Sequence, residues 1–214
     1  MPSEDPREDP GAFWDQRYDA ADYRFGTEPN VFLKTALHLL RPHGTVLELA
    51  CGEGRNAVAW AVEAGHVTAI DASAVGIAKA RHLAAEKNVR VEWVHADLLA
   101  WQPSHRYDAV ITSFLHSAPE NKTRWFALMR DAVAPGGFVA GEWFRPEQRT
   151  GGYTSGGPPD PAMMVSAEEL RHEFAGFHLE LLEELVYTLN EGRGHGGPAA
   201  VVRMIARAPY DLRA

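Results

Sequence analysis

A short stretch of the chain, Glu48 to Asn56, combines an acidic side chain, a cysteine and two glycines between an apolar run and a helix-forming run. Gly52 and Gly54 allow positive φ and let a ligand approach the backbone without a Cβ in the way. The helix after them offers N–H groups and a dipole that favour an anion, either a pyrophosphate or the carboxylate of an amino-acid-like cofactor. Asp71 ends the next apolar run, where a strand-end acid accepts hydrogen bonds from a ribose diol. The spacing therefore predicts a site for a nucleotide-containing cofactor.

Two cofactors fit this spacing. The segment Gly52–Ala57 reads G-x-G-x-x-A, the fingerprint of dinucleotide-binding domains, so the glycines alone leave NAD open. A dinucleotide domain usually opens with its first strand, whereas here residues 1–45 come first and Glu48 extends the string to E-x-A-C-G-E-G. Asp97-Leu98 follow the third apolar run, and P-G-G at 135–137 precedes the fifth strand. In order and spacing, the set resembles the motifs of the class I S-adenosylmethionine-dependent methyltransferases.

The resemblance implies roles for the residues that bind the cofactor. Arg55 and Asn56 are expected beside the methionine carboxylate. Asp71 is expected at the ribose hydroxyls, and Asp97 at the adenine amino group. Cys51 is expected to be a small buried residue, since sulfonium chemistry needs no enzyme thiolate. With Leu98 and Ala72 packed on the base and Phe114 at the methionine end, the full set predicted for S-adenosylmethionine is Tyr18, Glu48, Ala50, Cys51, Gly52, Glu53, Gly54, Arg55, Asn56, Asp71, Ala72, Asp97, Leu98 and Phe114.

The elements that must position these residues alternate between strand and helix from Gly44 onward. The first four strands are joined by crossovers too long for hairpins, which predicts a parallel, doubly wound α/β sheet. The last two apolar runs have a short connection, 190–198, so the final strand should run antiparallel to the rest. This resembles the Rossmann-like methyltransferase sheet of seven strands, order 3-2-1-4-5-7-6, with helices on both faces. The strands are expected at 45–50, 67–71, 90–94, 107–113, 137–144, 178–189 and 199–207, and the helices at 55–64, 74–87, 120–133 and 166–174.

Before the sheet, the chain is rich in aromatic residues. We expect a disordered tail over 1–10, then a single domain over 11–209 whose first part, 11–42, is a helical lid on the cofactor. The string F-G-T-E-P-N-x-F-L, followed by A-C-G-E-G-R-N-A, resembles the tellurite-resistance (TehB-like) branch, relatives of the thiopurine methyltransferases. That resemblance implies a small acceptor with a soft chalcogen nucleophile, such as tellurite, selenite or a thiol.

The acceptor site is expected beyond the carboxyl ends of the strands, where open α/β sheets bind ligands. His116 and Glu142 end the fourth and fifth strands, and a parallel sixth strand delivers Arg193 and His195 to the same rim. Arginine and histidine suit an oxyanion or an acidic thiol, although the glycine-rich 190–198 loop also fits a solvated hairpin tip. Glu142 either orients one of the histidines or is a buried structural carboxylate. These side chains lie on separate elements without ligand spacing, so no metal is predicted.

The glycine- and proline-rich segment 145–161 follows the fifth strand, and such long loops are often lids. It is expected to be mobile without ligand and to close over the acceptor, although a plain surface loop also fits.

Composition limits the remaining choices. The 214 residues, 45% hydrophobic, suit one α/β domain with a sizeable core. The net charge of -8, without basic runs, argues against a nucleic-acid or anionic-membrane partner, and no apolar segment reaches membrane-spanning length. The acidic start is unlike a signal peptide, so a cytoplasmic enzyme with a small-molecule acceptor is expected.

Two alternatives stay open. One is an NAD(P)-dependent oxidoreductase, although the chain has no Tyr-x-x-x-Lys pair, and the other is a cofactor-binding regulatory protein without turnover.

Overall fold

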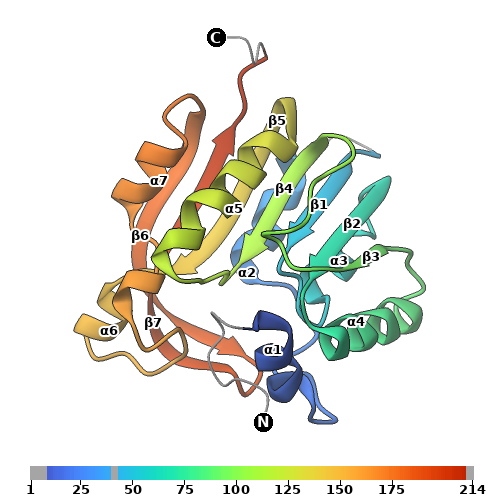
Figure 1. The fold of residues 1–214 in the computed structure, drawn as a ribbon, viewed down its shortest axis with the longest axis horizontal. Helices are drawn as coiled ribbons and strands as arrows, with labels where there is room; N and C mark the ends of the chain where they lie inside the picture. The colour runs from blue at the N-terminus through green and yellow to red at the C-terminus, as the bar shows by residue number, and fades with distance from the viewer. Residues whose placement is uncertain (1–8, 40–42, 211–214) are drawn as a thin grey trace.

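The computed structural model describes residues 9–39 and 43–210. Its centre is a seven-stranded sheet with the order β3-β2-β1-β4-β5-β7-β6, as Figure 1 shows. Strands β1 to β5 run parallel to one another, while β7 is antiparallel to both β5 and β6. This confirms the predicted order and direction of the strands. Their bounds are β1 Thr45–Leu49, β2 His66–Asp71, β3 Glu92–His95, β4 Tyr107–Ser113, β5 Val133–Phe144, β6 His178–Glu191 and β7 His195–Arg207.

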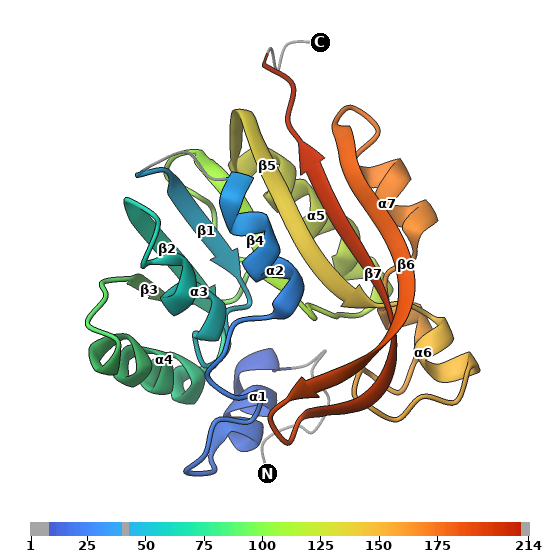
Figure 2. The same cartoon turned by 180° about the vertical axis from the view of Figure 1, so that it is seen from behind.

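Helices cover both faces of the sheet, as expected of a doubly wound fold. Helices α5 (Pro119–Ala132) and α7 (Ala167–Glu173) lie on the face seen in Figure 1. Helices α2 (Val31–Ala36, continued by the 3-10 turn Leu37–Leu39), α3 (Arg55–Trp60) and α4 (Ala74–Glu86) lie on the face seen in Figure 2. Each layer buries large apolar side chains against the central strands, which supplies most of the driving force for folding.

Two predicted boundaries are corrected. β5 begins at Val133 rather than 137, because Val133 already pairs with Tyr107 before the register shifts and Ala109 meets Phe138. β6 and β7 stay paired up to Glu191 and His195, so their turn is much shorter than the expected 190–198 connection. The long curved hairpin therefore carries its tip under the carboxyl ends of the parallel strands, next to α1 (Figure 2).

The chain before the sheet is docked on the same edge. Helix α1 spans Pro10–Tyr18, with Asp9 as its N-cap, so helix already begins at the last residue of the tail predicted over 1–10. Of the predicted tail, residues 1–8 lie outside the described residues, as do 40–42 of the predicted lid. Asp15 on α1 accepts hydrogen bonds from Ser73 Oγ at 2.6 Å and the Val75 N–H at 3.0 Å, at the start of α4. Lys79 on α4 donates to three carbonyl oxygens of residues 18–22, and these contacts fix the segment over the sheet edge.

The segment after β5 is less irregular than the expected long loop. It contains α6 (Glu147–Thr150), and the 3-10 turn Pro161–Met163 follows it. Arg149 donates to the carbonyl oxygens of Pro158 and Gly157 at 2.8 and 2.6 Å, which ties the segment together from within. Among the described residues, no helix is both long and apolar enough to cross a membrane.

Candidate active site

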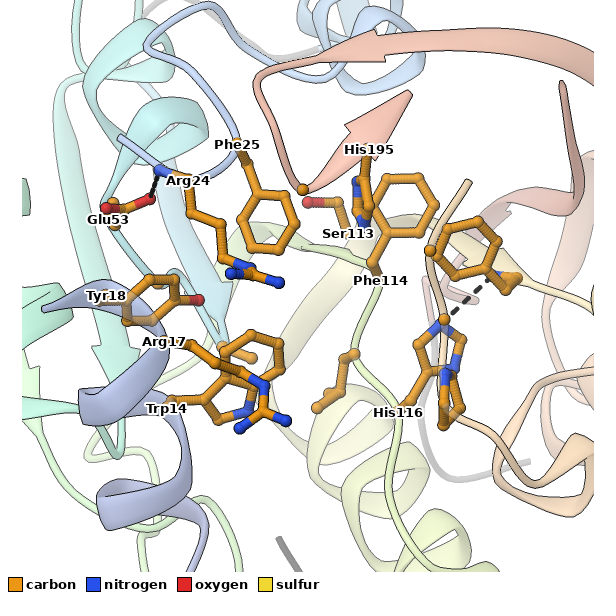
Figure 3. Close-up of a pocket in the computed structure, with 18 of the residues that line it drawn as sticks. Trp14, Arg17, Tyr18, Arg24, Phe25, Glu53, Ser113, Phe114, His116 and His195 are labelled. Carbon is orange, nitrogen blue, oxygen red and sulfur yellow. Dashed lines mark hydrogen bonds between the residues drawn. The ribbon is translucent and has the colours of Figure 1, made fainter. Parts of the chain in front are cut away.

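A cavity of about 930 Å³ lies at the carboxyl ends of the parallel strands, between α1 and the tip of the β6–β7 hairpin. This is the edge at which open α/β sheets bind ligands, and the volume is at the upper end of the roughly 300–1,000 Å³ usual for small-molecule sites. Figure 3 shows aromatic rings, two arginines and two histidines around it. The residues that line it are Phe13, Trp14, Arg17, Tyr18, Arg24, Phe25, Gly26, Ala50, Cys51, Gly52, Glu53, Arg55, Asn56, Asp71, Ser113, Phe114, Leu115, His116, Phe144, Gly156, Gly157, Pro158, Pro159, Asp160, Met163, Gly194 and His195.

Two non-glycine residues in the cavity wall have left-handed backbone. Ala50 and Phe114 follow the two central strands β1 and β4, with φ of 54° and 55°. Such conformations cost free energy and persist where surrounding structure enforces them, which is common at functional sites. The N–H of Phe114 donates to the Glu142 carbonyl oxygen at 2.7 Å, and this bond helps to hold the turn that directs the Phe114 ring into the cavity.

Asp71 ties the glycine turn to the end of β2. Its carboxylate accepts hydrogen bonds from the Gly52 N–H at 2.7 Å and the Ser73 N–H at 2.8 Å. Burial raises the pKa of this carboxyl, and the two N–H groups oppose the rise. A Cβ on Gly52 would lie 2.7 Å from the Tyr18 hydroxyl, so glycine is needed there. The structure thus brings Asp71, Gly52 and Tyr18 together in one wall of the cavity, as the sequence predicts.

Gly54 has a role in packing. It does not line the cavity, and a Cβ there would lie 2.5 Å from the Ala80 Cβ and 2.8 Å from the Trp93 ring. The missing side chain therefore lets α4 and β3 pack against the turn, and the expected approach of a ligand to Gly54 stays a prediction. Glu53, next to it, accepts from the Arg24 N–H at 2.7 Å and pairs with Lys79, so it fastens the N-terminal segment.

Asn56 lines the cavity and joins three elements at its wall. Its side-chain NH2 donates to Glu48 Oε1 at 2.9 Å and Ser113 Oγ at 3.0 Å, while its oxygen accepts from the Asn30 N–H at 2.8 Å. Glu48 itself lies beneath the wall and does not line the cavity; burial raises the pKa of its carboxyl to about 7. These two residues hold the strand ends and the start of α2 in place.

Arg55 is turned toward the C-terminal hairpin. Its guanidinium lies 2.8 Å from Glu191 and donates to the Phe25 carbonyl oxygen at 3.3 Å. It lines the cavity, but its nearest charged partner is this glutamate, so its expected place beside a methionine carboxylate stays a prediction. The Cys51 thiol also lines the cavity, and burial raises its pKa well above the usual range, as suits a packing residue.

The residues predicted at the adenine do not line the main cavity. Ala72 and Asp97 border a second cavity of about 250 Å³ together with residues 9–11 at the start of α1. A Cβ on Gly11 would lie 2.8 Å from the Ala72 carbonyl oxygen, so α1 packs closely at this point. Leu98 packs against the apolar layer beneath α5 instead of facing either cavity, which corrects its predicted contact with the base.

His195 stands in the opposite wall, where the topology of β6 led us to expect it. It is 5% exposed, and its Nδ1 lies 3.2 Å from Glu191 Oε2. Its ring packs among those of Phe25, Phe114 and Phe144, at centroid distances of 4.4, 4.4 and 5.3 Å. Burial lowers the pKa of His195 below its ordinary value, and the neighbouring Glu191 opposes that shift. The imidazole is therefore held neutral and ordered at the cavity.

His116 also lines the cavity but is the weaker base. Its Nε2 accepts a hydrogen bond from the Phe144 N–H at 3.3 Å, drawn as a dashed line in Figure 3. Burial lowers the pKa of His116 to about 3. A lone pair that is already hydrogen-bonded on a group of such low basicity is poorly placed to accept a substrate proton.

Two predicted acceptor residues lie outside the cavity. Arg193 is about half exposed and pairs with Asp22 at 3.2 Å on the surface, because it occupies the outward side of the hairpin turn. Glu142 is fully buried and accepts from Asn30 and Tyr187 at 2.8 and 2.7 Å. It also pairs with Arg203 and hydrogen-bonds neither histidine, so it is a structural carboxylate. Both residues are thereby removed from the acceptor pocket.

Several cavity residues were missed from the sequence. Phe13, Trp14, Arg17, Arg24 and Phe25 all come from the N-terminal segment, and the arginines bring positive charge to the cavity (Figure 3). The Arg17 guanidinium lies 3.3 Å from the centroid of the Phe13 ring. These residues could have been predicted from the alternation of arginine with aromatic residues in a segment already expected to be a lid. The wall formed by residues 156–160 belongs to the segment predicted to cover the acceptor.

The sequence is similar to known methyltransferases over about half of its length. Residues 46–137 match the family model of a methyltransferase domain. An uncharacterized methyltransferase of Mycobacterium tuberculosis is 32% identical over 115 residues, covering 52% of this chain and 57% of that protein. A probable thiol methyltransferase of Arabidopsis thaliana is 27% identical over 122 residues, covering 55% of this chain and 52% of that protein. The chain thus spans about half the length of the curated relatives it matches.

Two solved structures share the fold. TehB from Haemophilus influenzae has a TM-score of 0.68 at 18% identity, covering 92% of this chain and 66% of that chain. The N-methyltransferase NodS from Bradyrhizobium japonicum, in complex with S-adenosyl-L-homocysteine, has a TM-score of 0.65 at 15% identity, covering 94% and 99%. At these identities the two matches show the fold alone, and they agree with the predicted Rossmann-like methyltransferase sheet.

Proposed function

We propose that this chain carries a methyltransferase domain and that the whole protein is an S-adenosylmethionine-dependent methyltransferase that acts on a small molecule. The observation that carries the proposal is that one cavity joins two walls with different chemistry. One wall holds Asp71, Gly52 and Tyr18. These residues suit the ribose of a nucleoside cofactor and the part of it that lies against the protein backbone. The other holds His195 among aromatic rings, which suits an acceptor that must lose a proton.

The residues present fit such a cofactor. Asp71 keeps its carboxylate at the cavity with lone pairs beyond those used by two backbone N–H groups, so it can accept from ribose hydroxyls. At Gly52 the Tyr18 hydroxyl occupies the space that a Cβ would take, so the glycine turn and Tyr18 form one continuous wall beside Asp71. Bound S-adenosylmethionine supplies an electrophilic methyl group, and catalysis then depends on placing the nucleophile in line and, for some acceptors, on removing its proton.

We propose an acceptor with a soft chalcogen nucleophile. Support comes from the thiol methyltransferase relative and from the fold shared with TehB. The aromatic lining of Phe25, Phe114 and Phe144 favours a polarizable, weakly hydrated group over a strongly hydrated one. The cytoplasmic location expected from the sequence stays a prediction.

The two alternatives make different predictions. A dinucleotide-binding oxidoreductase usually has a sixth strand parallel to the others, whereas here the antiparallel β7 lies between β5 and β6. Titration calorimetry with S-adenosylhomocysteine and with NAD tests the cofactor, and tight NAD binding without a response to S-adenosylhomocysteine would overturn the proposal. A regulatory protein would bind S-adenosylhomocysteine yet methylate none of a panel of thiols, tellurite and selenite.

The acceptor wall is tested by comparing His195→Ala with His116→Ala. Because His195 is the better-placed base, His195→Ala is expected to lower turnover by about 100-fold or more while cofactor affinity stays nearly constant. His116→Ala should lower it much less. Full turnover in His195→Ala, with loss in His116→Ala, would move the base to the end of β4. Turnover is measured with one active acceptor, and affinity separately by calorimetry.

A further inference from the structure

Glu191 ends β6 and His195 begins β7, and the two residues face each other directly in the register of the C-terminal hairpin. Both are buried, with 8% and 5% of their surfaces exposed. His195 Nδ1 lies 3.2 Å from Glu191 Oε2. A carboxylate accepts hydrogen bonds only, so Nδ1 must carry the proton and Nε2 must hold the lone pair. A histidine in this tautomer is a base through Nε2.

Glu191 is itself held from two other elements. Arg55, at the start of α3, lies 2.8 Å from its Oε2, and the Asn30 amide before α2 donates to its Oε1 at 3.1 Å. Burial alone would raise the pKa of Glu191, but His195 and Arg55 outweigh it and the pKa is lowered. The carboxylate is therefore charged and fixed on both oxygens. Arg55 also belongs to the glycine turn of the cofactor wall, so this contact ties one wall of the cavity to the other.

The surroundings of His195 leave Nε2 for the cavity. Three neutral rings enclose the imidazole, and no described residue hydrogen-bonds Nε2. Besides Glu191, the charged or titratable groups that act on it are Arg55 from α3, Glu142 from β5 and His116 after β4. Gly156 packs against the ring, where a Cβ would come within 2.6 Å of Cδ2 and 3.1 Å of Nε2, and His195 still lines the cavity beside it.

We infer that Glu191 is a positioning residue that holds His195 as a general base for an acceptor arriving with a proton on its nucleophilic atom. This rests on the proposed function and narrows it to a thiol or selenol. Tellurite and selenite attack through a chalcogen lone pair that carries no proton. Methylation of such an acceptor needs no general base, so it would not use the buried, oriented imidazole–carboxylate pair. The favoured acceptor class is therefore a protonated thiol with an apolar body.

The transfer step balances with the groups present. The S–H bond of the acceptor breaks and its proton moves to His195 Nε2. A bond forms between that sulfur and the methyl carbon, while the bond from the methyl carbon to the sulfonium sulfur breaks. The products are a methyl thioether, S-adenosylhomocysteine and an imidazolium, whose charge Glu191 compensates until the proton leaves to solvent.

The test compares the wild type with Glu191→Gln and the conservative Glu191→Asp in the full chain. Acceptors are an alkyl thiol, protonated at neutral pH, and a nitro-substituted arenethiol, already a thiolate. We expect Glu191→Gln to lower kcat for the alkyl thiol by about 10- to 100-fold and for the arenethiol by less than about threefold, with partial rescue in Glu191→Asp. Glu183→Gln, the same exchange at an exposed position of β6, is the control. Equal losses with both thiols would show a merely structural role and overturn the inference.

A second readout does not depend on turnover. Nitrogen-15 NMR of His195 with bound S-adenosylhomocysteine should show the proton on Nδ1, and Glu191→Gln should lower the pKa of His195 further. A proton on Nε2 in the wild type, or an unchanged tautomer and pKa in the variant, would overturn the inference. Methylation of tellurite or selenite without turnover of any thiol overturns it too, while the proposed function stands. Failure to bind S-adenosylhomocysteine overturns both.

Discussion

At the scale of single residues, the site depends on side chains whose hydrogen bonds are shared between elements. Asp71 binds two backbone N–H groups at 2.7 and 2.8 Å, and Asn56 bonds to three neighbours at 2.8 to 3.0 Å. Such groups are positioned by contacts they make away from the ligand, which limits the reorganisation needed on binding. Changing one of them tests binding without removing an apolar core residue.

Asp71→Ala should weaken the binding of S-adenosylhomocysteine by about 1.5 to 3 kcal/mol, because a charged acceptor for the ribose hydroxyls is lost. Titration calorimetry measures the change, and circular dichroism checks that the variant is folded. Asp131→Ala, at an exposed position of α5, is the control. An unchanged dissociation constant in folded Asp71→Ala would remove this residue from the site.

His116 should make the folded state sensitive to acid. Its pKa is about 3 in the folded protein and near 6.5 when unfolded, so between these values the unfolded chain binds a proton that the folded chain does not. The free energy of unfolding should therefore fall by up to about 1.4 kcal/mol per pH unit as pH decreases through this range, and the contribution is absent above it. His116→Gln should reduce the slope, measured by urea unfolding at pH 4.5 and 7.5.

Glu48 acts in the opposite sense and must be separated from His116. Its folded pKa of about 7 lies above its ordinary value of 4.5, so its contribution to stability falls as pH rises between them. Because Glu48 is present in both proteins, it cancels in the difference between wild type and His116→Gln. His178→Gln, an exposed exchange on β6, should leave the slope as in the wild type. The same slope in all three proteins would contradict the assignment.

At the scale of elements, the cavity is closed by two segments that lie outside the sheet. Lys79 and Glu53 fasten the N-terminal segment, while the segment 145–161 is tied by Arg149 and by Gln148, which donates to Ser155 Oγ at 3.0 Å. Gly151 and Gly152 between those ties are exposed. The second segment thus has fixed points on either side of an exposed turn whose N–H groups bond back to α6, which suits a covering element that adjusts around a ligand.

We expect the segment 145–161 to be cleaved several-fold more slowly by a nonspecific protease when S-adenosylhomocysteine and an acceptor are both bound, because closure orders it over the cavity. Mass spectrometry of the fragments reports the cleavage rates. The exposed loop at 102–106, remote from the cavity lining, serves as the internal reference. Equal protection of both segments, or no change in either, would identify 145–161 as an ordinary surface loop.

At the scale of the whole molecule, the ligand-binding edge brings together parts of the chain that are far apart in sequence. The cavity wall combines α1, the turn after β1, the ends of β2, β4 and β5, and the hairpin tip. Figures 1 and 2 show from opposite sides how these elements gather at one edge of the sheet. A ligand that touches all of these parts binds the folded state only. Its binding energy therefore adds to the stability of the entire domain.

Saturation with S-adenosylhomocysteine at about 100 times its dissociation constant should stabilise the protein by about 2.7 kcal/mol. For a domain of this size that corresponds to a rise in Tm of roughly 5 to 10 °C. Differential scanning fluorimetry measures it, with NAD at the same concentration as the comparison. A rise with NAD and none with S-adenosylhomocysteine would contradict the proposed cofactor.

Much of this arrangement follows from the sequence by itself. The alternation of apolar strands with long crossovers predicted a parallel sheet, and the short connection between the last two strands predicted the antiparallel β7. The strand-end rule placed Asp71 and His195 on the same edge, and the structure brings both to the cavity. Chain reversal, strand period and crossover length each depend on residues that are contiguous in the sequence, so the sequence is enough to predict them.

Only the tertiary structure decided which side chains meet. The glutamate beside His195 is Glu191 and not Glu142, because the hairpin register sets Glu191 opposite His195 while Glu142 is enclosed by Asn30, Tyr187 and Arg203. Arg193 points outward for the same geometric reason. Gly54 serves the packing of α4, which no local pattern records. Contacts of this kind depend on strand register and on the packing of distant elements, and residue spacing along the chain does not encode them.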